Sequence, residues 1–304
     1  MKASISPWSF PGGLSGLTDY APAARQAKAA GFAGIEVALS PNGCMTPETK
    51  ETDIRKLAAS IRSEGVEVAG LASGMLWESS LTHPDVKVRE KGRDLVRRMI
   101  DAAPALGTDA ILVVPGAVDV FFMPDGPVVD YREAWSRATD AIGSLAGEAE
   151  KADVRLGIEN VWNRFLLSPL EMCQFIDQFK SKAVAAYFDV GNTMLLGYPE
   201  QWIRALGQRI MRVHVKDFRR AVGTVHGFVD LLSGDVNWPE VTRLREPVAQ
   251  PGMAAAEREA PVAVVVTTRA MRVARTESTG KTLRMVGSLL DVLESTRRAE
   301  ASTV

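Results

Sequence analysis

The chain has 304 residues, of which 46% are hydrophobic and 24% are charged, and its formal net charge is −1. This is the composition of a globular protein, and the near-neutral charge gives no sign of a surface for nucleic acid or membrane. No apolar run reaches the roughly 20 residues of a membrane span, and the N-terminal MKASISPWSF lacks the apolar core of a signal peptide. The two cysteines, Cys44 and Cys173, match no disulfide or metal framework. We therefore expect a cytoplasmic protein.

Short apolar segments alternate with amphipathic helical segments along the chain. The segments expected to form strands are residues 3–6, 34–39, 66–71, 109–115, 155–160, 184–190 and 210–217. The segments expected to form helices are residues 20–31, 48–64, 85–107, about 131–152, 168–179 and 199–207. The helix that starts at Ser168 has a serine N-cap, a proline in its first turn and a glutamate at its third position, all typical of helix starts.

These elements predict an α/β fold with a TIM barrel. Continuous apolar runs are typical of parallel strands covered on both faces. Seven strand-then-helix units, with APVAVVV at residues 260–266 as a candidate eighth strand, favour a barrel over an open doubly wound sheet. No GxGxxG pattern is present, which argues against a Rossmann domain. No linker divides the chain, so we expect a single domain over residues 1–304.

The composition changes near the C-terminus. After Trp238 the chain has no Phe, Tyr, Trp, His, Asn or Cys, and the sequence from Pro247 onward is rich in Ala, Val, Arg and Thr. We therefore expect residues 247–304 to form an atypical C-terminal segment and the last βα unit of the barrel to be unusual.

Polar residues stand where the predicted strands end, which is where TIM barrels place their chemistry. Glu159, Asp189 and His214 come from three consecutive strands. Each carboxylate alone is more often a helix cap or an ion-pair partner, and a lone histidine is often a core residue. Together they predict a site for a divalent cation, and oxygen ligands with one histidine suit Mn²⁺, Mg²⁺, Co²⁺ or Zn²⁺. Such a cation would also explain a buried carboxylate at position 159.

Further polar and aromatic residues follow the strand ends, and two interpretations of the tryptophans remain open. The tryptophans are either stacking surfaces for a sugar or packing at the rim of the barrel. His226 is a weaker candidate that reaches the site from the loop after the seventh strand, whereas His83 is expected in a loop after the third. The residues we expect to bind substrate are Trp8, Glu36, Ser73, Trp77, Trp162, Asn192 and Lys216.

Several long motifs carry a family resemblance. The segments ENVWNRFLLSPLEM, YFDVGN, GYPEQWIRALG, RVHVKDF and GFVDLLSGDVNWPEV resemble the sugar-phosphate isomerase/epimerase family with the xylose isomerase-like TIM barrel. The likeness is greatest to L-ribulose-5-phosphate 3-epimerases and hexulose-6-phosphate isomerases, and it covers about residues 3–246. It implies a divalent metal, Mn²⁺ first, held by Glu159, Asp189, His214 and a second glutamate. It also implies a homodimer.

The second glutamate is where this chain departs from the family pattern. The family places it at the end of the eighth strand, and Glu257 falls near the expected place, in MAAAERE. The candidate eighth strand itself ends on Thr267 and Thr268 and carries no carboxylate. The resemblance therefore implies that Glu159 and Glu257 exchange the substrate proton, or that the fourth ligand is absent and the site is impaired.

Four functions compete at this point. The first is a metal-dependent 3-epimerase of a ketose or ketose phosphate, which acts through a cis-enediolate. The second is an aldose–ketose isomerase on the same site, and the third is a catalytically impaired sugar-binding relative. The fourth is a metal-dependent endonuclease that shares this barrel, but it needs more than three histidines and a basic groove.

Overall fold

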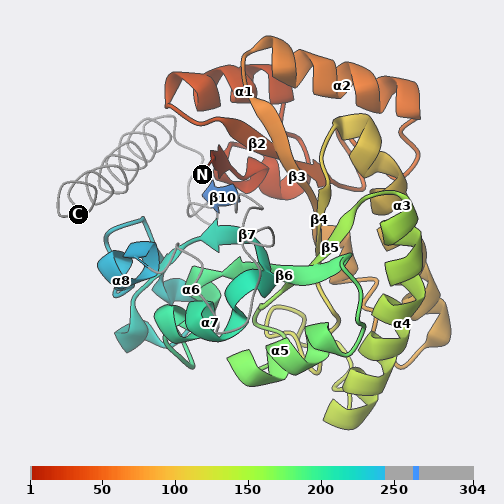
Figure 1. The fold of residues 1–304 in the computed structure, drawn as a ribbon, viewed down its shortest axis with the longest axis vertical. Coiled ribbons are helices and arrows are strands. Elements are labelled where there is room, and N and C mark those ends of the chain that lie inside the picture. The colour runs from red at the N-terminus through yellow and green to blue at the C-terminus, as the bar shows by residue number, and fades with distance from the viewer. Residues whose placement is uncertain (1, 244–262, 267–304) are drawn as a thin grey trace, which may run out of the picture.

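The computed structural model describes residues 2–243 and 263–266. Within them, eight parallel strands close into a barrel in the order β1-β10-β7-β6-β5-β4-β3-β2, with helices around the outside (Figure 1). The barrel strands are β1 (Ala3–Ile5), β2 (Gly34–Leu39), β3 (Glu67–Ser73), β4 (Ala110–Val113), β5 (Arg155–Glu159), β6 (Val184–Asp189), β7 (Ile210–Val215) and β10 (Ala263–Val266). The predicted TIM barrel is confirmed.

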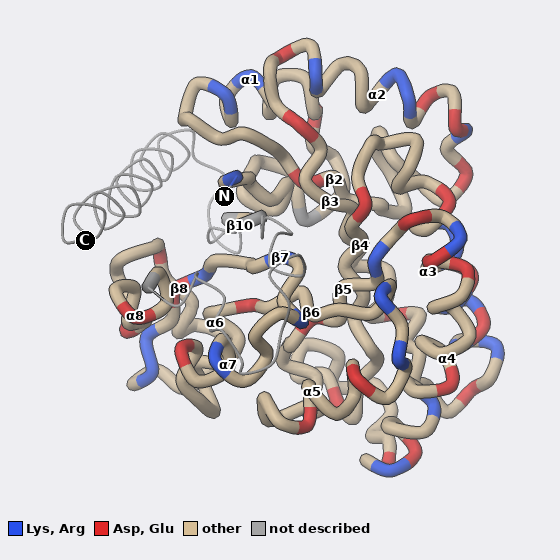
Figure 2. Tube along the Cα trace, viewed as in Figure 1, with Lys and Arg blue, Asp and Glu red and all other residues tan. Residues whose placement is uncertain are grey.

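The helices follow the strands as the alternating pattern predicts. They are α1 (Tyr20–Ala29), α2 (Glu51–Ser63), α3 (Val86–Leu106), α4 (Tyr131–Lys151), α5 (Pro169–Asp177), α6 (Val190–Thr193), α7 (Pro199–Leu206) and α8 (Trp238–Arg243). A small antiparallel pair, β8 (Asp217–Phe218) and β9 (Phe228–Val229), follows β7. Lysines, arginines and acidic residues are interspersed along the outer helices, as Figure 2 shows for α2, α3 and α4. No helix of the described residues is both long enough and apolar enough to span a membrane.

Local chemistry sets the helix boundaries. The Ser168 side chain accepts a hydrogen bond from the backbone of Glu171, and Pro169 stands at the first helical position, so α5 begins where the sequence predicts. The Asp85 side chain caps α3 in the same way, and α3 ends at Gly107, whose φ of 78° suits glycine.

The eighth strand follows β7 in the chain after the β8–β9 pair and α8. The candidate strand at residues 260–266 is present as β10, and it pairs in parallel with β1 on one side and β7 on the other. Apart from this strand, the atypical segment predicted for residues 247–304 lies outside the described residues. The single-domain organisation over residues 1–304 stays a prediction.

Side chains from non-adjacent strands meet inside the barrel. The Tyr187 hydroxyl of β6 donates to the Glu36 carboxylate of β2, although these strands are not neighbours. Gly157 of β5 makes room for this contact, because a Cβ atom there would lie 2.7 Å from Tyr187 Cδ2. The barrel interior thus carries buried polar groups directly beneath the carboxyl ends of the strands.

Candidate metal and substrate site

Three consecutive strands bring the predicted metal ligands together. Glu159 is the last residue of β5, Asp189 is the last residue of β6, and Asp189 stands opposite His214 in the β6–β7 register. One ligand atom from each of the three lies within 4.8 Å of the others, and all three residues are buried. The sequence prediction that these residues converge agrees with this geometry.

The imidazole of His214 has a different environment at each nitrogen. Its Nδ1 atom lies 3.2 Å from Glu159 Oε1 and 3.8 Å from Asp189 Oδ2. Its Nε2 atom lies 3.3 Å from Glu36 Oε2. The Nδ1 atom therefore faces the carboxylates of the candidate metal site, and the Nε2 atom faces away from them.

The donor set fits a divalent cation. Among the described residues, Asp189 Oδ2 is buried and accepts no hydrogen bond of good geometry, although Lys216 Nζ lies 2.7 Å away. Within residues 2–243 and 263–266, the groups that become positive and pair with the carboxylates of Glu36, Glu159 and Asp189 are His214 and Lys216. If a divalent cation replaces the proton of His214, the formal charges of these groups and the cation cancel. Two carboxylates and one imidazole suit Mn²⁺, Mg²⁺, Co²⁺ or Zn²⁺.

Without a cation, protons on His214 and Lys216 balance part of the negative charge of the carboxylates. Burial lowers the pKa of His214, but the carboxylates of Glu36 and Glu159 outweigh burial and raise this pKa to about 9. Burial also lowers the pKa of Lys216, and the carboxylates, Asp189 first, outweigh it and raise this pKa above its ordinary value. Both side chains are positive at neutral pH, so metal binding at His214 displaces a proton.

Asn160, a polar residue at the end of the fifth predicted strand to which the sequence analysis gave no role, fixes the ends of β5 and β6. The Asn160 side chain donates to the carbonyl of Asp189 at 2.8 Å and accepts from its backbone N–H at 2.7 Å. The Asn192 side chain donates to the carbonyl of Asn160 at 3.0 Å, and Trp162 Nε1 donates to the carbonyl of Asn192 at 3.0 Å. This network holds Glu159 and Asp189 side by side. The signal in the sequence was an asparagine directly after a strand-end glutamate.

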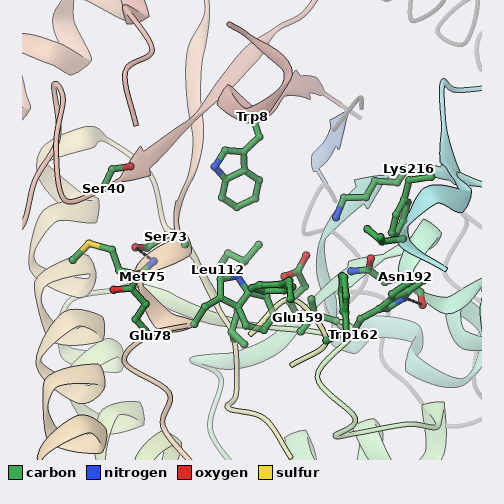
Figure 3. Close-up of a pocket in the computed structure, with 18 of the residues that line it drawn as sticks. Trp8, Ser40, Ser73, Met75, Glu78, Leu112, Glu159, Trp162, Asn192 and Lys216 are labelled. Carbon is green, nitrogen blue, oxygen red and sulfur yellow. Dashed lines mark hydrogen bonds between the residues drawn. The ribbon is translucent and has the colours of Figure 1, made fainter. Parts of the chain in front are cut away.

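A cavity of about 770 Å³ opens at the carboxyl ends of the strands (Figure 3). In Figure 3, Trp8 points into it from one side, and Glu159 and Trp162 lie on the opposite side. His214 and Asp189 do not line the cavity, whereas Glu159 does. The predicted substrate-binding residues that line it are Trp8, Ser73, Trp77, Trp162, Asn192 and Lys216.

Two predicted substrate contacts have other partners in the structure. Glu36 is completely buried and is absent from the cavity lining; its carboxylate contacts His214 and Tyr187 instead. Ser73 lines the cavity, but its hydroxyl donates to the carbonyl of Leu39 at 2.8 Å and accepts from the backbone of Met75.

The remaining histidines and the second glutamate complete the predicted set. His226 lines the cavity, as expected for the loop after β7. His83 accepts a hydrogen bond from the backbone of Asp85, just before α3, and does not line the cavity. Glu257 lies outside the described residues, so its role as ligand and acid/base stays a prediction.

Two phenylalanines that the sequence prediction missed join Trp77 and Trp162 in an aromatic wall of the cavity. Phe121 and Phe122 follow β4, are 44% and 47% exposed, and line the cavity. Phe122 packs edge-on against Trp77, and Phe121 packs edge-on against Trp162, with ring centroids 5.1 and 5.8 Å apart. A continuous aromatic surface therefore faces the cavity, suited to the apolar face of a sugar.

Comparisons with known proteins agree with this fold. The family model described as "Xylose isomerase-like TIM barrel" matches residues 24–259. A search of curated proteins returned no significant sequence match.

Solved structures of similar fold include sugar epimerases. D-psicose 3-epimerase from Clostridium cellulolyticum H10, with D-tagatose, aligns with a TM-score of 0.75 at 18% identity over 97% of this chain and 99% of that one. An L-ribulose 3-epimerase aligns with a TM-score of 0.73 at 16% identity over 100% and 98%. A xylose isomerase-like TIM barrel protein from Mycobacterium smegmatis, in complex with magnesium, aligns with a TM-score of 0.68 at 16% identity over 96% and 97%. At these identities the likeness establishes the fold.

Proposed function

Because the chain belongs to the xylose isomerase-like TIM barrel family, we propose that it is a divalent-metal-dependent 3-epimerase of a ketose that works through a cis-enediolate. Similar folds are found in a D-psicose 3-epimerase and an L-ribulose 3-epimerase. The buried group of Glu159, Asp189 and His214 supports a metal site at the carboxyl ends of β5, β6 and β7. Mn²⁺ is the metal we expect first, and a similar fold binds magnesium.

The observation that carries this proposal is the position of Glu159. Of the three candidate ligands, it alone lines the cavity, so its carboxylate is open to both the cation and the substrate. When bound, a divalent cation would supply positive charge that favours loss of a proton beside the ketose carbonyl. Glu159 then accepts the proton from carbon 3 on one face of the sugar.

Epimerisation also needs an acid on the opposite face of carbon 3. Glu257 is our candidate for this group. Lys216, whose ammonium lies 2.7 Å from Asp189 and which lines the cavity, would donate a hydrogen bond to a substrate oxygen. Trp8 would cover the sugar from the other side and exclude water.

The cavity favours a free ketose over a ketose phosphate. Among its described lining residues Lys216 is the one lysine or arginine, and Asp189 already neutralises it. A phosphate group is usually met by arginine, by several cations or by a helix N-terminus. The aromatic wall instead suits an uncharged sugar, so we expect higher kcat/KM on D-fructose or D-tagatose than on L-ribulose 5-phosphate.

Deuterium exchange at carbon 3 in Mn²⁺-loaded protein tests the proposal. The wild-type chain should exchange this proton of D-fructose or D-tagatose in D₂O, and Glu159→Gln should lose about 10²–10⁴ of the rate, because an amide cannot accept a proton. Glu67→Gln is the matched control, since Glu67 is the exposed first residue of β3 and pairs with Lys2. Wild-type exchange in Glu159→Gln would contradict the role of Glu159.

The position of the label separates the alternatives. Exchange at carbon 1 or 2 with no exchange at carbon 3 would identify an aldose–ketose isomerase. Metal and sugar binding without exchange at any carbon would identify an impaired relative.

A further inference from the structure

The Glu36 carboxylate is buried in the barrel interior, outside the lining of the cavity. Glu36 lies in the middle of β2, is 0% exposed, and is absent from the cavity lining. A buried carboxylate is costly unless hydrogen bonds and charges compensate it. Its two oxygens contact Tyr187 and His214, which come from strands that are not neighbours of β2. The cost is therefore met by contacts across the barrel interior.

These contacts bear on which nitrogen of His214 is available to a metal. A neutral imidazole carries its proton on one nitrogen and a lone pair on the other. The carboxylate of Glu36 has acceptor oxygens only, so the Nε2 atom 3.3 Å away must carry the proton to bond with it. The Nδ1 atom, 3.2 Å from Glu159 Oε1, also carries a proton while no cation is bound, and this is the proton that a cation would displace to reach the lone pair of Nδ1.

Tyr187 holds Glu36 in turn. Its hydroxyl donates to Glu36 Oε1, which leaves Oε2 directed at His214. Its ring lies 4.7 Å from the imidazole, measured between ring centroids. Gly157 lacks the side chain that would compete for this space, because a Cβ there would lie 2.7 Å from Tyr187 Cδ2.

We propose that Glu36 and Tyr187 are positioning residues that fix the Nε2–H tautomer of His214 and so present Nδ1 to the divalent cation. This inference rests on the metal site of the proposed function and assigns Glu36 to the side of His214 opposite the cation. Carboxylates that accept a hydrogen bond from a metal-bound histidine orient the ring and raise its basicity.

Calorimetric titration of the full-length, chelator-treated protein with Co²⁺ tests this role, together with the visible spectrum of bound Co²⁺. Glu36→Gln keeps the size of the side chain but offers an amide N–H that competes for Nε2 and favours the wrong tautomer. We expect it to weaken Co²⁺ binding by about 10–100-fold and to change the spectrum. Tyr187→Phe should also weaken Co²⁺ binding, by a smaller factor. Saturating Co²⁺ should restore most of the metal occupancy in both variants.

Glu67→Gln, at the exposed start of β3, is the control and should bind Co²⁺ as the wild type does. A purely structural role for Glu36 would lower thermal stability and leave Co²⁺ affinity and spectrum unchanged, and that result would overturn the inference. If Glu36→Gln does not fold, unchanged affinity and spectrum in Tyr187→Phe would overturn it. If the wild type binds no Co²⁺, the metal site of the proposed function fails and the positioning role fails with it. If the wild type binds and the variants match it, only the positioning role fails.

Discussion

Asn160 and Asp189 exchange two hydrogen bonds across the ends of β5 and β6. The Asn160 side chain donates to the Asp189 carbonyl and accepts from its N–H, at 2.8 and 2.7 Å, and both residues are buried. This pair fixes the spacing of two neighbouring strands where the candidate metal ligands project. A side chain that belongs neither to the candidate metal group nor to the cavity lining thus helps to determine where Glu159 and Asp189 lie.

Asn160→Ala should weaken both the fold and the metal site. Each buried backbone group left without a partner costs about 1–3 kcal/mol. Urea unfolding should show a loss in this range or above it, and Mn²⁺ affinity should fall. Asn160→Asp keeps the acceptor but loses the donor and adds a buried negative charge beside Glu159 and Asp189, so it should destabilise the fold at least as much as Asn160→Ala. Equal stability of wild type and Asn160→Ala would contradict the role of the two Asn160–Asp189 hydrogen bonds.

Gly157→Ala should disturb the barrel interior next to the candidate metal site. An added Cβ would lie 2.7 Å from Tyr187 Cδ2 and 2.9 Å from Met211 Cε, and overpacking of this kind typically costs about 1–3 kcal/mol. Gly147→Ala is the matched control, because Gly147 lies within α4 with nothing within 4 Å of the added Cβ. The control should be stabilised by about 0.5–1 kcal/mol, as expected of alanine within a helix. Thermal melts of both variants measure this, and a neutral Gly157→Ala would show that the interior accommodates a methyl group.

Phe121→Ala should affect sugar binding and leave metal binding intact. Phe121 is 44% exposed and faces the cavity, so its loss removes stacking surface at small cost to the fold. We expect KM to rise several-fold, since an aromatic contact contributes about 0.5–1.5 kcal/mol, with Mn²⁺ affinity unchanged. Leu170→Ala, an exposed apolar residue of α5 outside the cavity lining, is the control. An unchanged KM in Phe121→Ala would contradict a contact between the sugar and this aromatic surface.

Asp109 should contribute a pH-dependent part of the stability. Burial raises its pKa, but Arg212 and Arg155 outweigh burial, so the net pKa of this carboxyl is below its ordinary value. Its oxygens lie 2.7 Å from Arg212 and 2.6 Å from Arg155. Because the folded pKa is the lower one, this stabilisation is present above the unfolded pKa of about 3.9 and is lost as pH falls through the folded value.

Asp109→Asn provides the comparison for this pH dependence. The difference in unfolding free energy between wild type and Asp109→Asn should be greatest near neutral pH and should shrink below about pH 4. Urea unfolding at several pH values measures it. A difference that grows towards acid pH would contradict the sign of the shift.

The fold and the convergence of the three candidate ligands were predictable from the sequence because both follow from local pattern. Continuous apolar segments predict parallel strands, and the carboxyl ends of such strands meet at one end of a barrel, so Glu159, Asp189 and His214 had to converge. The β10 strand was visible for the same reason.

Contacts across the barrel interior were not predictable in this way. Glu36 was predicted at a strand end, but it lies in the middle of β2, and its partners lie 151 and 178 residues away in sequence. Whether a strand residue faces the cavity or the interior depends on register and barrel stagger, which the pattern of apolar residues leaves open. Phe121 and Phe122 lie on a loop, where sequence carries little information about position.

Metal content after loading tests the central claim most directly. The chain is incubated with Mn²⁺, dialysed against metal-free buffer, and analysed by elemental analysis beside His214→Ala and Asp189→Asn. About one Mn²⁺ per chain should remain in the wild type and far less in either variant, because each lacks one of three converging ligands. A wild-type value near zero, or equal retention in all three proteins, would contradict the metal site at the ends of β5, β6 and β7.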